Sequence, residues 1–119
     1  MLEVGSYCGR ATTVLGSVVR AVRANARVFA IDPHDGFVGA LDRGLERGEP
    51  TLETLRKNIA RAHLLPFVEI IQGQAQDVPW SEPLCLLLID GLHDYPNVLM
   101  DFTHFEAHLV DGGLALFHD

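Results

Sequence analysis

The chain has 119 residues and a net charge of −7 at neutral pH, and 48% of its residues are hydrophobic. This length suits one domain over residues 1–119, and the apolar content is too high for a disordered chain. The acidic balance argues against nucleic acid or an anionic membrane surface as a partner, and no apolar run approaches the ~20 residues of a membrane span. Two isolated cysteines, Cys8 and Cys85, and the lack of a basic-then-apolar leader predict a cytoplasmic protein with reduced thiols.

The first predicted element is a short buried strand at residues 2–4, which runs into a glycine loop and a helix. The order is acid-x-Gly-x-x-x-Gly, with Glu3 before Gly5 and Gly9. Glycine has no Cβ and takes positive φ, so it lets a ligand or another backbone approach closely. The dinucleotide fingerprint needs a further glycine in this loop, and here Ser-Tyr-Cys fills the gap. A plain glycine turn between strand and helix, which is common in α/β proteins, is the alternative interpretation.

Amphipathic periodicity predicts a helix over residues 10–24. Its expected buried face consists of the apolar residues that recur at intervals of three and four, namely Ala11, Val14, Leu15, Val18 and Val22. A second strand is predicted at residues 27–31, because an unbroken apolar run is typical of a buried parallel strand. This strand ends at Asp32.

The same alternation continues through the rest of the chain. Residues 37–48, which contain several glycines, are expected to form a loop with a short helix. The remaining predicted elements are a helix from Thr51, a strand at 67–72, a connection at 73–83, a strand at 84–90, a helix from Tyr95, a turn at 111–113 and a strand at 114–117. On the last helix, Asp101, His104 and His108 share one flank, which is expected to face solvent; zinc binding by the three residues is the alternative.

Strands that alternate with helices predict an α/β domain with an open, doubly wound parallel sheet. Ligands of such sheets bind outside the carboxyl ends of the strands. Four of the five predicted strands end in or beside an acid, and the acids are Glu3, Asp32, Asp90 and Asp119. Packing alone does not explain these carboxylates, so the sequence predicts a ligand site at this edge.

Two of these strand ends have residues that suit a nucleoside. Asp32 can accept hydrogen bonds from both hydroxyls of a ribose, although it can equally cap the turn that follows it. Gly73, Gln74 and Ala75 follow the third strand, where their amides and the Gln74 side chain can reach the edge of an adenine. A loop without a ligand is the alternative for these three residues.

Two later stretches carry a resemblance to a known family. The fourth predicted strand ends in Asp-Gly-Leu-His-Asp-Tyr at residues 90–95, and the fifth follows Asp-Gly-Gly at 111–113 and ends in Phe-His-Asp at 117–119. Together with the first glycine loop, they resemble class I S-adenosylmethionine (SAM) methyltransferases, in particular a group related to sugar and antibiotic O-methyltransferases. The resemblance spans nearly the whole chain.

The resemblance implies a Rossmann-like sheet with strand order 3-2-1-4-5 and a set of cofactor-binding residues. These are Glu3, Gly5, Ser6, Gly9, Asp32, Gly73, Gln74, Ala75 and Asp90. Members of the family normally have two more strands, one of them antiparallel, after the fifth, and further residues before the first. The chain is therefore expected to be a form truncated at both ends that lacks the C-terminal antiparallel strands. The open sheet edge predicts a homo-oligomer or a missing partner segment.

The resemblance also implies a candidate metal site and candidate catalytic residues. Metal-dependent members hold a divalent ion, usually Mg²⁺, and the matching ligands here are Asp90, His118 and Asp119. Sugar methyltransferases often have an acid where this chain has Leu92. His93 is the candidate general base, since the ordinary pKa of histidine lies near neutrality, and Asp90 is the second candidate catalytic residue. In the alternative interpretation, His93 only holds the turn before the last helix.

The predicted function is that of a SAM-dependent methyltransferase that methylates an oxygen of a small-molecule acceptor. A catalytically inactive or fragmentary SAM-binding domain is the alternative. An NAD-dependent oxidoreductase is disfavoured by the missing middle glycine of the first loop.

Overall fold

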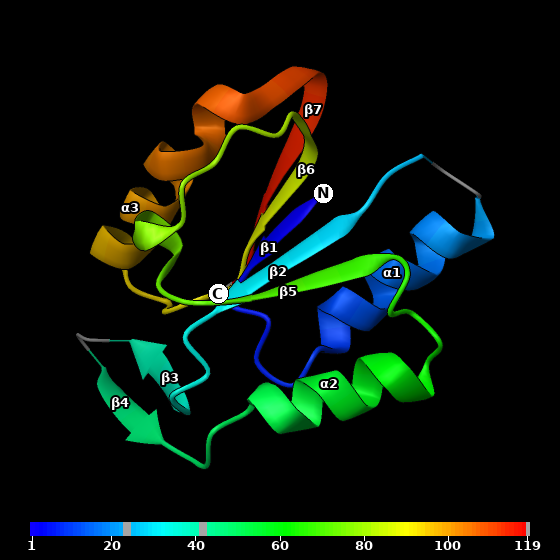
Figure 1. The fold of residues 1–119 in the computed structure, drawn as a ribbon. Helices are drawn as coiled ribbons and strands as arrows, with labels where there is room; N and C mark the ends of the chain where they lie inside the picture. Colours follow the sequence, from blue (N-terminus) through cyan, green and yellow to red (C-terminus); the bar gives the residue numbers. More distant parts are fainter. Residues whose placement is uncertain (23–24, 41–42, 119) are drawn as a thin grey trace.

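A five-stranded parallel sheet lies between two layers of helices (Figure 1). The structure, a computed structural model, describes residues 1–22, 25–40 and 43–118. The strands of the sheet are β1 (Leu2–Val4), β2 (Val28–Asp32), β5 (Val68–Gln72), β6 (Leu84–Ile89) and β7 (Leu109–Phe117). Helices α1 (Arg10–Ala21) and α2 (Leu52–Arg61) cover one face, and α3 (Tyr95–Phe105) covers the other. Two 3-10 turns, η1 (Ala75–Asp77) and η2 (Glu106–His108), and two short strands, β3 (Phe37–Ala40) and β4 (Gly44–Arg47), complete the fold.

The strand order is β5-β2-β1-β6-β7, and every neighbouring pair in this sheet is parallel. Counted within the sheet alone, this is the order 3-2-1-4-5, so the predicted Rossmann-like fold is confirmed; β3 and β4 are additional strands outside it. The central strand β1 pairs with β2, where Leu2 lies opposite Phe29, and with β6, where Leu2 lies opposite Leu87. The strand order therefore reverses beside β1, and the carboxyl ends at such a point form a crevice for ligands.

Each face of the sheet has its own apolar core. The core under α3 consists of Leu2, Val4, Ile31, Ala75, Leu84, Leu87, Ile89 and Phe105. The core under α1 and α2 consists of Val19, Val28, Ala30, Leu55, Ile59, Leu64 and Val68. Removal of one such aliphatic or aromatic side chain from water contributes about 1.5–3 kcal/mol, so the two cores together hold the helices on the sheet.

The predicted buried face of α1 is confirmed at Leu15, which packs against the core, and is wrong at its valines. Thr12, Gly16 and Val19 face the sheet, whereas Val14 and Val18 are 60% and 45% exposed. A Cβ on Gly16 would lie 3.0 Å from the Val68 side chain, so a small residue is needed for α1 to pack this closely. Because α1 lies so close to the sheet, its buried side includes the small residues Thr12 and Gly16, and Val14, Val18 and Val22 face outward. Residues 23–24, the predicted end of this helix, lie outside the described residues.

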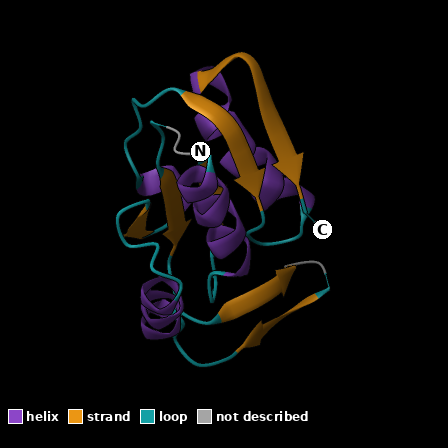
Figure 2. Ribbon diagram, turned by 90° about the vertical axis from the view of Figure 1, so that its right-hand side faces the viewer, coloured by secondary structure: helices purple, strands orange, loops and turns teal. Residues whose placement is uncertain are grey.

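Residues 37–40 and 44–47 form two paired strands where a loop with a short helix was expected. β3 and β4 pair antiparallel, with Phe37 opposite Arg47, and the Arg47 guanidinium lies 5.2 Å from the centre of the Phe37 ring. Gly39 and Gly44 have φ angles of 108° and 103°, which other residues rarely adopt. Figure 2 shows that the hairpin lies beyond the carboxyl ends of the sheet strands, so it can form one wall of a site there.

The turn predicted at residues 111–113 is a bulge inside a longer strand. From Leu84 to Leu86, β6 advances two positions, while β7 advances five, from Leu109 to Leu114, so the glycines sit in the extra length. Beyond the bulge β7 is an edge strand, and Leu114 and Leu116 are exposed. Self-association through this edge stays a prediction. None of the described helices is long and apolar enough to cross a bilayer.

Candidate functional site

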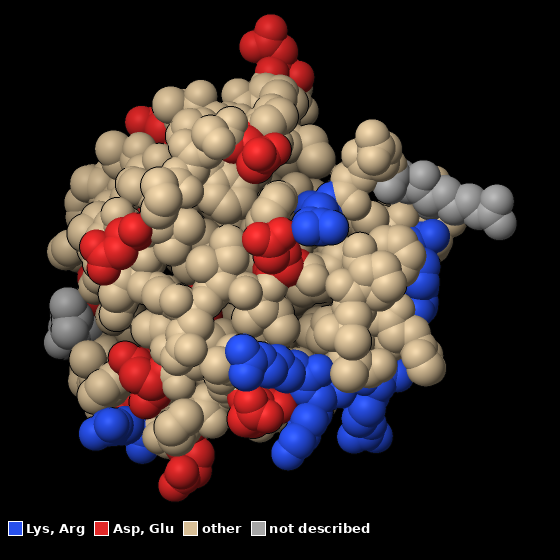
Figure 3. All heavy atoms as spheres, in the orientation of Figure 1, with Lys and Arg blue, Asp and Glu red and all other residues tan. Residues whose placement is uncertain are grey.

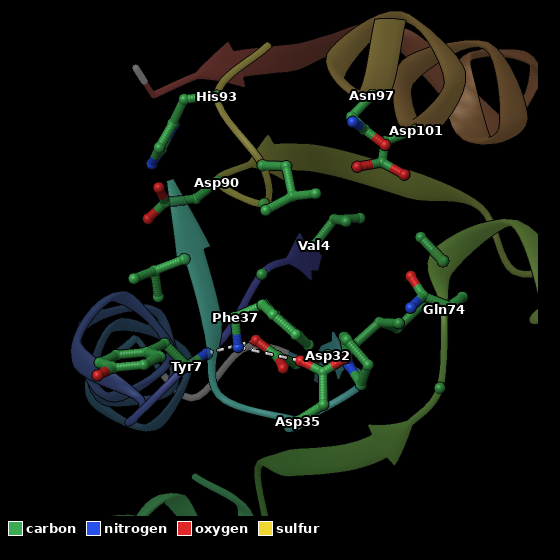
Figure 4. Close-up of a pocket in the computed structure, with 18 of the residues that line it drawn as sticks. Val4, Tyr7, Asp32, Asp35, Phe37, Gln74, Asp90, His93, Asn97 and Asp101 are labelled. Atoms are coloured by element: carbon green, nitrogen blue, oxygen red, sulfur yellow. Dashed lines mark hydrogen bonds between the residues drawn. The ribbon is translucent and has the colours of Figure 1, made fainter. Parts of the chain in front are cut away.

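A cavity of about 400 Å³ lies at the carboxyl ends of the strands, between the glycine loop, the hairpin and α3. Its volume falls within the range of small-molecule sites. Seven of the predicted site residues line it: Gly5, Asp32, Gly73, Gln74, Ala75, Asp90 and His93. Figure 4 shows Asp90 and His93 close together on one side of the cavity and Asn97 and Asp101 beside each other on α3, with Asp32 and Gln74 on the opposite wall.

The glycine loop is held close to the end of β6. Gly5 has a φ angle of 88°, and a Cβ there would lie 2.1 Å from the main-chain oxygen of Asp90. Gly9 has a φ angle of 87°, and its Cβ would overlap the Leu55 side chain of α2. Both glycines therefore serve close backbone or helix packing. The Ser6 hydroxyl is buried without a hydrogen-bond partner among the described residues.

Glu3 lies behind the loop, outside the cavity lining. It is 1% exposed, and its carboxyl group accepts a hydrogen bond from the Thr12 hydroxyl. Burial raises the pKa of Glu3 to about 7; the Thr12 hydrogen bond opposes this rise, and the nearby Asp90 and Asp32 add to it. Glu3, like Ser6 and Gly9, belongs to the support of the loop in this structure, and direct contact of these three with a cofactor stays a prediction.

The raised pKa of Glu3 makes stability depend on pH. Between pH 4.5 and about 7, the folded protein keeps a proton on Glu3 that the unfolded chain releases, so the free energy of unfolding falls as pH rises. Glu3→Gln removes this dependence, and the fall between pH 5 and 7.5 is expected to shrink by roughly 3 kcal/mol at most. Urea unfolding at both pH values measures it.

The control for this experiment is Glu69→Gln. Glu69 is an exposed acid of β5 that pairs with Arg27 on the surface, so its replacement is expected to leave most of the pH dependence in place. An equal pH dependence in the parent and in Glu3→Gln would contradict the argument.

Asp32 ties the glycine loop to the end of β2. Its two carboxylate oxygens accept hydrogen bonds from the backbone N–H of His34 at 2.6 Å and of Tyr7 at 2.8 Å. The turn-capping interpretation is therefore present in the structure. Each carboxylate oxygen has a second lone pair, and the side chain lines the cavity, so the carboxylate also remains available to a ligand.

Asp90, His93 and His118 converge at one end of the site. The Nδ1 of His118 lies 3.0 Å from an Asp90 oxygen, and one potential ligand atom from each of the three residues lies within 4.8 Å of the other two. Asp119 lies outside the described residues. One carboxylate and two imidazoles do not match the all-oxygen environment that Mg²⁺ prefers.

His93 is oriented by its neighbours. Its ring Nδ1 lies 3.2 Å from the main-chain oxygen of His118, and its backbone N–H donates to the oxygen of Gly39 in the hairpin. When Nδ1 carries the proton of that hydrogen bond, Nε2 has a free lone pair. The arrangement provides a proton acceptor at the cavity.

Sequence reasoning missed Asn97 and Asp101, which line the cavity from α3. The prediction that Asp101 faces solvent is wrong, since it is 7% exposed. His104 of the same predicted flank also points inward, with Nε2 2.9 Å from the main-chain oxygen of Val78. The signal in the sequence was an acid within the apolar stripe of Val98, Phe102 and Phe105.

The profile of a family described as "Methyltransferase domain" matches residues 2–119. This match covers nearly the whole chain, including the glycine loop and both ends of the cavity. The chain belongs to the methyltransferase domain family. The resemblance seen in the sequence is thereby confirmed.

Solved structures with the same fold include other methyltransferases. An rRNA methylase from Streptococcus thermophilus is 15% identical with a TM-score of 0.68, and the match covers 98% of this chain and 59% of that one. The StiE O-MT, residues 961–1257, is 14% identical with a TM-score of 0.66, and the match covers 98% of this chain and 36% of that one. A SAM-dependent methyltransferase from Thiobacillus denitrificans, in complex with S-adenosyl-L-homocysteine, is 17% identical with a TM-score of 0.64, covering 98% and 40%.

This methyltransferase domain thus spans between about a third and three fifths of the length of these three proteins. At these identities the comparison concerns the fold alone.

Proposed function

We propose that this methyltransferase domain binds SAM in its cavity and methylates an oxygen of a small molecule. The observation that carries the proposal is the placement of a ribose-type acid, a glycine loop and a histidine around one cavity at the point where the strand order reverses. The complex of the Thiobacillus protein with S-adenosyl-L-homocysteine, which has the same fold, supports it.

Three groups of the chain would divide the work. The second lone pairs of Asp32 would accept the ribose hydroxyls, and the loop at Gly5 would lie beside the amino-acid part of the ligand. The bound cofactor supplies an electrophilic methyl group on a sulfonium. His93 Nε2 would take the proton from the acceptor hydroxyl, and the ends of the cavity would hold donor and acceptor in line.

One polar group of the cavity wall fits a ligand of this kind. Asp101 is 7% exposed and lines the cavity, and no hydrogen bond joins its carboxylate to a residue that the structure describes. Buried polar groups are normally hydrogen-bonded, so this carboxylate favours a polar ligand over an apolar one.

Charge favours a small acceptor over RNA, the substrate type named for the Streptococcus relative. The chain carries a net charge of −7, and Figure 3 shows acids spread over the face that it draws, with Lys and Arg gathered mainly near α1 and α2. An RNA substrate needs cations around the site itself. A cytoplasmic location fits this chemistry and is part of the proposal.

A divalent cation stays a prediction. The described donors, one carboxylate and two imidazoles, suit a transition ion such as Zn²⁺ or Mn²⁺ better than Mg²⁺. A cofactor-binding domain without activity is the second candidate, because the chain spans 36% of the StiE O-MT.

Calorimetry with S-adenosylhomocysteine tests the proposal. We expect micromolar binding and no detectable binding of NAD. Asp32→Asn is expected to weaken binding roughly 10- to 100-fold, the loss expected for hydrogen bonds to a charged group. Asp32 also holds the loop, so a loss of affinity alone does not prove contact with the ribose. The ratio of the dissociation constants of S-adenosylhomocysteine and its 2′-deoxyribose analogue is more specific, and Asp32→Asn is expected to bring this ratio closer to one. A parent protein that binds NAD, or that does not bind S-adenosylhomocysteine, would refute the proposal.

A further inference from the structure

The hairpin of β3 and β4 brings apolar side chains to the cavity next to His93. The backbone N–H of His93 donates to the main-chain oxygen of Gly39 at 2.9 Å, and Leu45 is the cross-strand partner of Gly39. Leu45, Val38 and Leu92 all line the cavity, and Leu45 and Val38 are 39% and 37% exposed. None of these three side chains can form a hydrogen bond. Exposed apolar side chains that gather at a cavity are typical of a ligand-binding wall.

The charges around the cavity limit what this wall can bind. Among the residues that the structure describes, no Lys or Arg lines the cavity, whereas four acids do: Asp32, Asp35, Asp90 and Asp101. A carboxylate or phosphate on the acceptor would meet these acids without a cation to offset the repulsion, and partial burial strengthens the repulsion. The cavity therefore favours an uncharged acceptor over an anionic one.

The acidity of the acceptor hydroxyl narrows the class further. In the proposed function this hydroxyl gives its proton to His93 Nε2 and its oxygen attacks the methyl carbon, while the electron pair of the broken C–S bond stays on the sulfur. An imidazole removes a proton from a phenol, whose ordinary pKa is about 10, far more readily than from an aliphatic hydroxyl, which is a much weaker acid. A sugar would also place several hydroxyls against side chains that cannot bond them.

We propose that the acceptor is an uncharged phenol whose ring packs against Val38, Leu45 and Leu92 and whose hydroxyl faces His93. An aromatic ring offers these aliphatic side chains a large apolar surface, and its single hydroxyl needs only the partner that His93 supplies. The hairpin then selects the acceptor. The inference rests on the proposed function and adds the substrate class to it.

The binding of three probes to the protein saturated with S-adenosylhomocysteine tests the inference. 2-Naphthol is an uncharged phenol, 6-hydroxy-2-naphthoate adds a carboxylate to the same ring system, and methyl glucoside carries only aliphatic hydroxyls. Calorimetry is expected to give a dissociation constant for 2-naphthol at least about 10-fold below those of the other two probes. Undetectable binding of 2-naphthol, or equally tight binding of either of the other probes, would overturn the inference.

Leu45→Lys tests whether the hairpin forms the wall. The variant puts a cation beside the ring, so the ratio of the dissociation constants of the naphthoate and 2-naphthol is expected to fall to about one or below. Leu65→Lys is the matched control, because it adds the same charge at an exposed leucine outside the cavity lining, and it should keep the parent's ratio. The ratio is taken on one protein, so partial unfolding of a variant does not affect it.

An unchanged ratio in Leu45→Lys would also overturn the inference. In each of these cases S-adenosylhomocysteine still binds, and the proposed function stands with a different acceptor. A parent that does not bind S-adenosylhomocysteine overturns both.

Discussion

Gly5→Ala is expected to lower the free energy of unfolding by more than about 3 kcal/mol. The added methyl group would lie 2.1 Å from the Asp90 main-chain oxygen and 2.6 Å from the Gly91 nitrogen, and neither atom can rotate away. The φ angle of 88° adds about 1–2 kcal/mol of strain for any residue with a Cβ. Relief of the overlap requires the ends of β1 and β6 to separate, which would open the core at Val4 and Ile89. Urea unfolding monitored by circular dichroism measures the loss.

Gly112→Ala separates the overlap from the backbone strain. Gly112 has a φ angle of 78°, but no atom lies within 4 Å of the position of its Cβ. We therefore expect about 1–2 kcal/mol of destabilisation from the backbone conformation alone. Equal losses in the two variants would show that the contact between the loop and β6 has no energetic importance.

His93→Gln is expected to slow methyl transfer by about 10²- to 10⁴-fold, the usual contribution of a general base. Glutamine keeps hydrogen-bonding capacity but cannot take a proton at neutral pH, so binding of S-adenosylhomocysteine should change little. The rate is measured with phenol and sugar hydroxyl acceptors that the parent methylates. His108→Gln, which replaces a histidine of η2 outside the cavity lining, should keep the parent's rate.

Measuring the rate in the presence of a chelator distinguishes a general base from a metal ligand at His93. If His93 acts as a base without a cation, EDTA leaves the parent's rate unchanged. A parent that loses activity in EDTA and regains it with Zn²⁺ or Mn²⁺ would assign His93 to a metal site instead. A His93→Gln variant with the parent's rate would exclude both roles.

The strand order and much of the cavity lining followed from the sequence because both depend on local signals. Unbroken apolar runs mark buried parallel strands, and the carboxyl ends of parallel strands meet at one edge. The sequence alone therefore predicts that residues as far apart as Gly5, Asp32 and His93 lie at one site.

The rest depends on contacts between distant residues. The buried face of α1 is determined by the close packing of Gly16 against Val68. Hydrophobic periodicity does not detect this contact, because glycine has no apolar side chain. The hairpin of β3 and β4 depends on pairing between its two strands. The glycines in this segment favour a loop in a sequence-based prediction, so the strands were not predicted. Asp101 looked like a surface acid, since only the packing of α3 over the end of β6 brings it to the cavity. For Gly5, the expected close approach of another backbone is confirmed, and that backbone is the main chain of Asp90.

The central position of β1 also affects how the domain forms as it is synthesised. Leu2 leaves the ribosome 85 residues before its partner Leu87. At ordinary translation rates that delay is roughly 4 to 17 seconds. Over this time β1 can pair with β2 on one side only, and its other side presents unpaired backbone groups. Pairing between strands that are far apart in the sequence makes folding slow. The incomplete sheet is therefore the species that chaperones would have to keep from associating with other copies of itself.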